Sequence, residues 1–385
     1  MNADERRCAL ALSRMGYHNI TVLRELYNAW GSMADIVKQH AHPEQLAPNM
    51  PERLLAAFAH TDEHLKRADE EMRFAQDNNI SIITLADEAY PQRLKACFDA
   101  PLALFFKGNA NLNAKHCISI VGTRKATPYA ADCIAQLTAR LKQLCPDILI
   151  VSGLAYGVDI MAHRQAIDHA LPTVAVLAHG LDTLYPTRHR KEATLMMQNG
   201  GLLTEYFSQS KIDKRNFLQR NRIVAGMSAA TLLVESAEHG GGLVTCRLAQ
   251  SYQHDVFAFP GSINNPYSMG CNRLIRDNMA GLVTSAEDIL KAMAWEEDMK
   301  ETAATNAASS MGSSVLGATS ASTAKVPNGA QGVLDVLTKE NDLHIDIIAT
   351  RAGLPVNKVL ALLFQLEMSG MVSSLSGGRY HKVNS

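Results

Sequence analysis

The sequence predicts an α/β fold, with a Rossmann-like parallel sheet as its core, an all-helical domain before it and a winged-helix domain after it. Six short segments are apolar on both faces and alternate with amphipathic stretches, which is the pattern of a parallel sheet covered by helices on two sides. The chain has 385 residues. This length exceeds what one hydrophobic core usually supports, so two or three domains are expected.

Residues 1–80 predict the helical domain. Apolar residues recur with helical spacing at Leu10, Leu12 and Met15, and again from Val22 onward. Glycines such as Gly16 mark turns between short helices. We therefore expect a small bundle of helices at the start of the chain.

The core domain is predicted over residues 81–295, where the pattern changes to short apolar runs. Each run is too short for a helix and is bounded by polar or glycine-rich segments, as in strands buried inside a parallel sheet. The expected strands cover residues 118–121, 148–151, 173–177, 201–204, 231–234 and 256–259.

The end of the chain predicts a linker and a second small domain. Residues 296–328 are dominated by Ala, Ser, Thr and Gly, which bury too little surface to offset the entropy of ordering, so a flexible linker is expected there. Residues 329–385 predict a winged helix-turn-helix. Its three helices are expected at residues 331–339, 345–351 and 356–369, followed by two short strands around a glycine pair.

Composition excludes few classes of protein but sets the cellular context. The net charge is −1, which argues only weakly against a nucleic-acid protein because a local basic stripe sets phosphate affinity. The seven cysteines form no C-x-x-C pair, so neither a disulfide framework nor a zinc cluster is expected. No apolar run reaches the roughly 18 residues of a membrane helix, and the first ten residues lack the apolar stretch of a signal peptide. We therefore expect a cytosolic protein without membrane contact.

The loop after the first expected strand carries residues suited to phosphate binding. Ligands of open parallel sheets bind beyond the carboxyl ends of the strands. There, Gly122, Thr123 and Arg124 offer close backbone approach, free amides and a guanidinium. An ordinary turn with an exposed arginine is the alternative interpretation.

The loop after the second expected strand predicts another anion site. Ser152 is followed by Gly153 and Gly157, and two glycines at this spacing permit a tight turn whose amides face an anion. Asp159 is a candidate to cap or orient the loop. The pattern is not G-x-G-x-x-G, so binding of a dinucleotide is disfavoured.

Two further segments follow later strands. Residues 211–222 concentrate five basic residues around Phe217, which combines backbone neutralisation with a ring for base stacking; a solvated helix start is the alternative. Gly240, Gly241 and Gly242 precede a helix and predict an amide-rich cradle for an anion. Phosphate-friendly loops thus follow most of the expected strands.

These segments resemble, in order, the motif series of the DNA-processing A (DprA/Smf) family. The resemblance covers about residues 85–290, and six motifs in sequence make it specific. At the first loop the family usually has Gly-Ser-Arg and at the fifth Gly-Gly-Thr, so Thr123 and Gly242 are mild departures. The motifs are GTR at 122–124, SGLAYGVD at 152–159, GLDTLYP at 180–186, RNRIVAG at 220–226, GGGLVT at 240–245 and NPYSMGCNRLI at 265–275.

The resemblance implies an extended Rossmann-like core and a homodimer that binds single-stranded DNA without ATP. This dimer is expected to protect incoming DNA and to load the RecA recombinase during natural transformation, with no enzymatic activity and no metal or cofactor. It also implies that residues 1–80 are a sterile-alpha-motif-like domain. The family's phosphate-binding arginine corresponds to Arg124, and its basic and base-stacking pair to Lys214 and Phe217. Together with the loops above, the residues expected to bind DNA are Gly122, Thr123, Arg124, Ser152, Gly153, Gly157, Lys214, Phe217, Arg220, Asn221, Arg222, Gly240, Gly241, Gly242 and Asn272.

Two other functions remain open from the sequence. A nucleotide phosphoribohydrolase of the lysine-decarboxylase-like Rossmann group would use Glu235 or Glu238 as its acid or base, although the proline and the Gly-Thr step of that group's glycine motif are missing. A winged-helix regulator that senses a nucleotide would need a helix able to read duplex DNA, and the expected third helix of the tail, with Lys358 as its one basic residue, is largely apolar.

Overall fold

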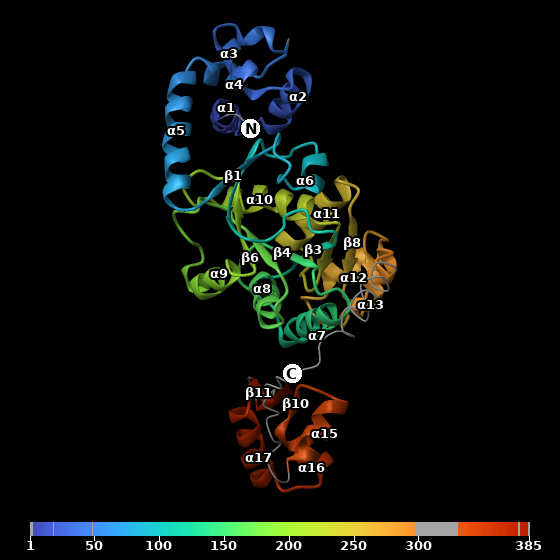
Figure 1. The fold of residues 1–385 in the computed structure, drawn as a ribbon. Helices are drawn as coiled ribbons and strands as arrows, with labels where there is room; N and C mark the ends of the chain where they lie inside the picture. The colour runs from blue at the N-terminus through green and yellow to red at the C-terminus, as the bar shows by residue number, and fades with distance from the viewer. Residues whose placement is uncertain (1–2, 18, 48, 297–329, 376–377, 384–385) are drawn as a thin grey trace, which may run out of the picture. The chain divides into compact units, whose positions relative to one another are not determined.

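The structure is a computed structural model that describes residues 3–17, 19–47, 49–296, 330–375 and 378–383 (Figure 1). The chain forms two compact units: Met1–Ala126 with Leu137–Trp295, and Thr127–Gln136 with Glu296–Ser385. The expected helical domain and the expected core therefore belong to one unit. Apart from Glu296, the predicted linker over residues 296–328 lies outside the described residues.

The described residues up to Asp77 form helices joined by short turns and loops, with no strand among them. Helix α1 lies at the centre of this region and buries Leu10 and Leu12 completely. The Glu5 carboxylate on α1 accepts the Ala34 N–H (N···Oε2 3.0 Å) and so caps the start of α3. The helices are α1 (Ala3–Met15), α2 (Ile20–Trp30), α3 (Met33–Lys38), α4 (Glu52–Phe58) and α5 (Thr61–Asp77), with 3-10 turns at Gln39–Ala41 and Pro43–Gln45.

A nine-stranded sheet forms the core, in the order β1-β2-β6-β5-β4-β3-β7-β8-β9. The six expected strands are confirmed, and all six pair in parallel with one another. Nearly all of their residues are buried, as expected for strands covered on both faces. These strands are β3 (Cys117–Val121), β4 (Leu149–Ser152), β5 (Thr173–Val176), β6 (Gly200–Thr204), β7 (Ala230–Leu233) and β8 (Asp255–Ala258).

Three further strands extend this sheet beyond the predicted six. β1 (Ser81–Thr84) and β2 (Ala103–Gly108) are antiparallel to their neighbours, and β2 joins the edge of β6. The short β9 (Gly281–Leu282) pairs in parallel with β8. Gly201 lets β2 approach β6, because a Cβ at this position would lie 2.5 Å from the Phe106 ring.

Helices cover both faces of the sheet (Figure 1). α8 and α9 pack together against β4, β5 and β6, whereas α10 and α11 pack together against β3 and β7. Strand order reverses at β3, which lies between β4 and β7, and this reversal creates the crevice where ligands of such sheets bind. The helices of the core are α6 (Gln92–Ala96), α7 (Pro128–Leu144), α8 (Val158–Asp168), α9 (Arg190–Met196), α10 (Lys214–Met227), α11 (Gly241–Ser251), α12 (Met269–Arg276) and α13 (Ala286–Ala292), with a 3-10 turn at Thr187–His189.

The tail of the chain has the winged-helix fold that its sequence predicts. Its three helices pack around a small apolar core that includes Val333, Ile348 and Leu363. Gly353 takes a left-handed conformation (φ 65°) at the end of α16 and so permits the sharp turn into α17. The elements are α15 (Gln331–Lys339), β10 (Leu343–His344), α16 (Ile345–Ala352), α17 (Val356–Met368), β11 (Val372–Leu375) and β12 (Arg379–Lys382).

Within the described residues, no single helix has the length and apolar character needed to cross a membrane. One pair of helices, α16 with α17, passes on length and composition together, but it is bent by 106°.

Candidate nucleic-acid interface

A cavity of about 310 Å³, which we call the switch-point groove, lies at the carboxyl ends of β3, β4 and β7. It brings together most of the residues that the sequence predicts to bind DNA, from the loops after these three strands, from α10 and from the start of α11. The groove is lined by Val121, Gly122, Thr123, Arg124, Gly153, Ala155, Asp159, Phe217, Leu218, Arg220, Asn221, Val224, Ser236, Ala237, His239, Gly240, Gly241, Gly242 and Thr245.

Backbone hydrogen bonds join the loops of the groove to one another. The Thr123 N–H donates to the Glu235 carbonyl (2.8 Å), and the Val158 N–H donates to the Thr123 carbonyl (3.1 Å). Gly157 is required at this junction, because its φ is +77° and a Cβ there would lie 2.2 Å from the Thr123 oxygen. Gly157 therefore shapes the groove from behind and does not line it.

The glycine run after β7 places the start of α11 against the groove. Gly242 is packed so closely that a Cβ would lie 2.8 Å from the Leu233 side chain and 3.1 Å from the Gly122 Cα. Gly240 and Gly241 are exposed at the beginning of this helix. The first N–H groups of a helix have no partner within it, and they favour an anion at this end.

A cation and two aromatic rings meet at the rim of the groove. The Arg124 guanidinium lies over the Phe217 ring, with 5.4 Å between its carbon and the ring centroid. The Tyr185 ring meets the Phe217 ring edge to face, with centroids 5.8 Å apart. Arg124 and Tyr185 are exposed and Phe217 is half-buried, so a base can reach the rings.

Tyr185 is a candidate that the sequence prediction missed, although it lies in the GLDTLYP segment already singled out. Its backbone is held in place by His179, whose Nε2 accepts the Tyr185 N–H (3.1 Å). With Nε2 as the acceptor, the proton of a neutral His179 ring is on Nδ1, which donates to the Gly180 carbonyl (2.9 Å). The ring of Tyr185 is thus presented by a fixed loop.

Arg220 is buried at the groove and holds a neighbouring loop. It lines the groove, but the residue is only 3% exposed, and its Nη1 donates to the carbonyls of Gly153 (2.7 Å) and Val176. These bonds hold the Gly153 loop in place. The Arg220 Nη1 thus positions the loop, and a phosphate contact by this residue stays a prediction.

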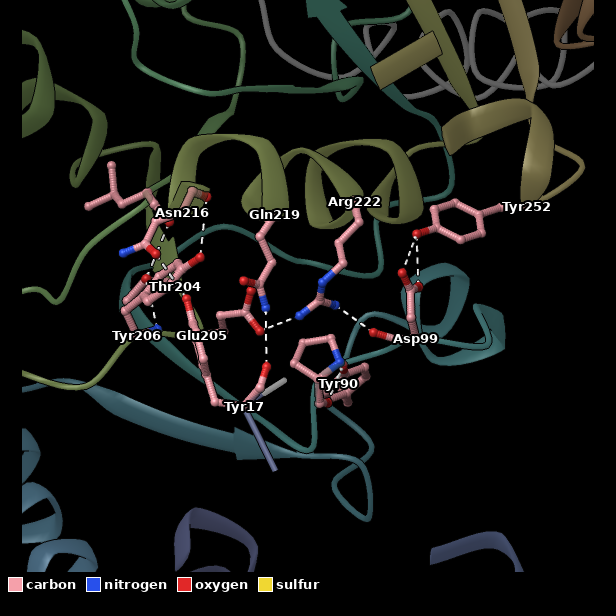
Figure 2. A network of polar contacts seen from close by, with 12 residues as sticks. Tyr17, Tyr90, Asp99, Thr204, Glu205, Tyr206, Asn216, Gln219, Arg222 and Tyr252 are labelled. Atoms are coloured by element: carbon pink, nitrogen blue, oxygen red, sulfur yellow. Dashed lines mark hydrogen bonds and ion pairs between the residues drawn. The ribbon is translucent and has the colours of Figure 1, made fainter. Parts of the chain in front are cut away.

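The predicted DNA contact is wrong for Arg222, because this residue faces away from the groove. Its side chain is buried, forms an ion pair with Glu205 and donates to the Asp99 carbonyl. Figure 2 shows Arg222 between Glu205 and Asp99, whose carboxylate accepts the Tyr252 hydroxyl (2.8 Å). This buried pair supports the fold and cannot reach a phosphate.

Three other expected residues also lie outside the groove lining. The buried Ser152 hydroxyl donates to the Ile120 carbonyl (2.6 Å), so it ties β4 to β3. The Asn272 amide bridges the backbone N–H and carbonyl of Gly261 (3.1 and 2.9 Å) and shapes the loop after β8. Lys214 is exposed at the first position of α10 and does not line the groove.

The groove holds one carboxylate among its lining residues, Asp159. Its Oδ2 accepts the Ala155 N–H (3.3 Å), as expected of a residue that orients the loop. Burial raises the pKa of Asp159, and the nearby positive charge of Arg220 opposes this shift. Asp159 is therefore the one negative side chain in the groove lining, against the exposed Arg124 guanidinium and the N-terminus of α11.

His163, which is buried in α8, gives the folded protein a pH dependence. Its Nδ1 lies 2.8 Å from the Thr173 hydroxyl, which donates to the Ile150 carbonyl, whereas its buried Nε2 has no hydrogen-bond partner among the described residues. Burial, followed by the charge of Arg220, lowers the pKa of His163 from 6.5 to about 3. The unfolded chain binds the extra proton between these values, so stability falls as the pH drops through this window.

We expect His163→Asn to remove about 2 kcal/mol of the stability loss between pH 7 and pH 5, which is the share of one histidine with this shift. Urea unfolding of the native protein and the variant at both pH values measures this difference. An equal loss in both proteins would contradict the assignment.

Comparison with known proteins identifies close similarity to one group. Residues 81–294 match the family model of DNA recombination-mediator protein A, and residues 317–378 match that of the DprA winged helix domain. The protein Smf of Escherichia coli (strain K12) is 33% identical over 314 residues, which are 81% of this chain and 80% of that protein.

Solved structures of two DNA processing proteins resemble the chain. The X-ray structure of DNA processing protein A from Streptococcus pneumoniae has a TM-score of 0.62 at 29% identity, and the match covers 73% of this chain and 95% of that one. The protein from Helicobacter pylori, whose structure is described for its single-stranded DNA binding mode, has a TM-score of 0.51 at 29% identity over 56% of this chain and 96% of that one.

Proposed function

Because this chain belongs to the DprA/Smf family of DNA recombination-mediator proteins, we propose that it binds single-stranded DNA in the switch-point groove. The observation that carries the proposal is the rim of the groove, where the Arg124 guanidinium lies on Phe217 and Tyr185 stands beside it. A cation that neutralises phosphate next to exposed rings that stack on bases is the combination used by sequence-tolerant single-strand binding.

The groove also suggests how one strand would lie. The Arg124 guanidinium and the N–H groups at Gly241 and Gly242, at the start of α11, would hold phosphates, because both present donors to the same cavity. The bases would turn outward onto Phe217 and Tyr185. Such a strand has its bases unpaired, so duplex DNA would bind more weakly.

A titration of fluorescent oligothymidine and of the matching duplex, without nucleotide and at two salt concentrations, tests the proposal. We expect tighter binding of the single strand and a steep loss of affinity with salt, because phosphate contacts release counterions. Equal affinity for both forms, or no binding, would refute it.

Tyr185→Ala is expected to weaken single-strand binding by roughly 5- to 150-fold, since one aromatic stack contributes about 1–3 kcal/mol. Stacking involves no counterion release, so the dependence of affinity on salt should stay the same. A strand containing 2-aminopurine reports stacking directly through quenching of its fluorescence, and the variant should lose part of this quenching.

Tyr156→Ala is the matched control for this variant. Tyr156 is similarly exposed (41% against 43%), but its ring packs against His189, whereas the Tyr185 ring packs against Phe217, which lines the groove. Its removal should change affinity by less than about twofold. Equal effects of the two substitutions would contradict a specific role for Tyr185.

We extend the proposal to the finer role that the family resemblance implies, namely protection of incoming DNA and loading of RecA, without ATP, by a homodimer during natural transformation. Two grooves on one dimer would hold two strands, which suits a protein that brings strands together. Strand exchange by RecA on DNA coated with a single-strand-binding protein, with and without this chain, tests the loading step.

A hydrolase finds less support in the groove. Neither candidate lines the cavity: the Glu235 residue is only 1% exposed, and Glu238 lies outside beside Arg273 (Oε1–Nη1 3.9 Å). We therefore propose that the chain acts by binding. Release of free base from a nucleoside monophosphate by this chain would support the phosphoribohydrolase alternative instead.

A duplex-reading regulator also finds less support. α17 has Lys358 as its single basic residue and exposes Leu360 (50%) and Phe364 (64%). Apolar side chains on this helix favour contact with protein over a DNA groove.

A further inference from the structure

A second cavity of about 470 Å³ lies between the N-terminal helices and the segment that follows β6. We call it the helical-domain cavity. One wall comes from the end of α1 and the start of α2, and the other from residues 205–211 and the first turn of α10. It therefore lies beyond the carboxyl end of a parallel strand, where ligands of such sheets bind, and the helical domain completes it.

Most polar groups of this cavity already have partners within the chain. The Ser208 hydroxyl donates to the Glu71 carboxylate (2.6 Å), and Arg67 is paired with the same carboxylate. The Asn216 amide donates to the carbonyls of Ala178 (3.3 Å) and Lys211 (3.2 Å). Glu205 is paired with Arg222. These groups form fixed walls and leave no negative charge uncompensated.

Two cations remain without a counterion in the described part of the chain. Lys211 and Arg14 both line the cavity and are exposed, and neither forms an ion pair with a described residue. Arg14 Nη1 contacts His64 Nδ1 (3.0 Å), and burial followed by the charge of Arg14 lowers the pKa of His64, which favours the neutral form of this ring. The mouth of the cavity is therefore positive.

The interior offers rings and apolar side chains. Tyr17 and Tyr206 meet edge to face, with ring centroids 5.9 Å apart. Both hydroxyls are anchored on Asn216, Tyr17 to its side-chain oxygen (2.9 Å) and Tyr206 to its carbonyl (3.2 Å) (Figure 2). Leu23 and Ala103 complete the wall. A flat organic ring fits such surroundings.

From the positive mouth and the aromatic interior we infer that the helical-domain cavity is a second ligand site, for a nucleoside phosphate. Arg14 and Lys211 would hold the phosphate and the base would lie against Tyr17 and the apolar wall. A volume of about 470 Å³ is in the range of small-molecule sites, roughly 300–1,000 Å³. The ligand is either a free mononucleotide or the phosphorylated end of a DNA strand, which share this chemistry.

Calorimetric titration of the full chain with dAMP, deoxyadenosine and inorganic phosphate tests the site. We expect dAMP to bind roughly tenfold or more tightly than either part, because only the nucleotide uses both the cations and the rings. Arg14→Gln combined with Lys211→Gln should weaken dAMP roughly tenfold or more. The matched control, Arg53→Gln with Lys291→Gln, removes the same charges from exposed positions that line neither cavity, and should leave dAMP binding intact.

Arg124→Glu separates this inference from the proposed function. If dAMP binding persists in that variant, the ligand is not in the switch-point groove. If it is lost there and unchanged in the Arg14 and Lys211 variant, the second site is refuted while the groove still stands. No dAMP binding at all, or equal loss in the control pair, also refutes the second site.

The two sources of the ligand are told apart with a short oligothymidine carrying either a 5′-phosphate or a 5′-hydroxyl. If strand ends occupy the cavity, the Arg14 and Lys211 variant should lose affinity for the phosphorylated strand only. If the ligand is a free nucleotide, the two strands should bind the variant as they bind the native protein.

Discussion

Arg124→Glu is expected to weaken single-stranded DNA binding by roughly 30- to 100-fold at low salt. Arg124 is the one arginine of the expected set whose guanidinium is exposed at the groove, and a hydrogen bond to a charged group contributes about 1.5–3 kcal/mol. Reversal of the charge adds repulsion to the loss of the contact. It also removes one counterion-releasing contact, so the slope of log affinity against log salt should fall by about one.

Lys125→Glu provides the control for this prediction. Lys125 follows Arg124 in the chain and is also exposed, but it does not line the groove. Its substitution by Glu changes the net charge by the same amount. Anisotropy titrations of both variants at several salt concentrations give affinity and slope together. Equal weakening by the two substitutions would mean that only the overall field matters, and the groove would lose its main support.

Arg222→Met is expected to lower the free energy of unfolding by about 3–5 kcal/mol, the usual cost of leaving one partner of a buried ion pair alone. Glu205 would remain buried with no cation, and the Asp99 carbonyl would lose its donor (Figure 2). Urea unfolding followed by circular dichroism measures the loss. If Arg222→Met remains folded, its affinity for single-stranded DNA should stay within about twofold of that of the native protein.

A double variant, Arg222→Met with Glu205→Leu, distinguishes the buried charge from the loss of packing. Replacing both charges with apolar groups is often neutral, so the double variant should recover much of the stability lost by the single one. If the single variant folds normally but loses DNA binding, Arg222 acts at the groove after all, and the correction drawn from the structure is wrong.

The sequence was sufficient for the parallel core because each of its strands is a run of apolar residues bounded by glycine or polar loops. The antiparallel β1 and β2 were not predicted individually. β2 is apolar like the others, but it lies outside the alternation of strands and helices that marks the parallel core, and nothing in its own sequence identifies β6 as its antiparallel partner.

The candidate site was predictable as a set of loops but not as a set of side chains. Because all three are basic, Arg220 and Arg222 are predicted to bind DNA together with Arg124. Helical spacing held more information: Phe217, Asn221 and Val224 recur at i, i+4 and i+7 on the face of α10 that lines the groove. Arg222 is five residues after Phe217, about 140° around the helix, and so belongs to another face.

Even that spacing could not have identified the role of Arg220, which shares the face of Phe217. Its guanidinium binds two carbonyls that are distant in the chain, that of Gly153 in the loop after β4 and that of Val176 at the end of β5. Whether a basic side chain meets solvent or backbone depends on how the loops close over it, and only the folded structure shows this.

The first turn of α10 has a consequence of its own, because adjacent residues there border different cavities: Asn216 lines the helical-domain cavity and Phe217 the switch-point groove. A ligand that shifts this turn from one side alters the free energy of binding on the other. Thermodynamic linkage makes the effect reciprocal. If a nucleotide in one cavity raises the affinity for DNA in the other, bound DNA raises the affinity for the nucleotide by the same factor.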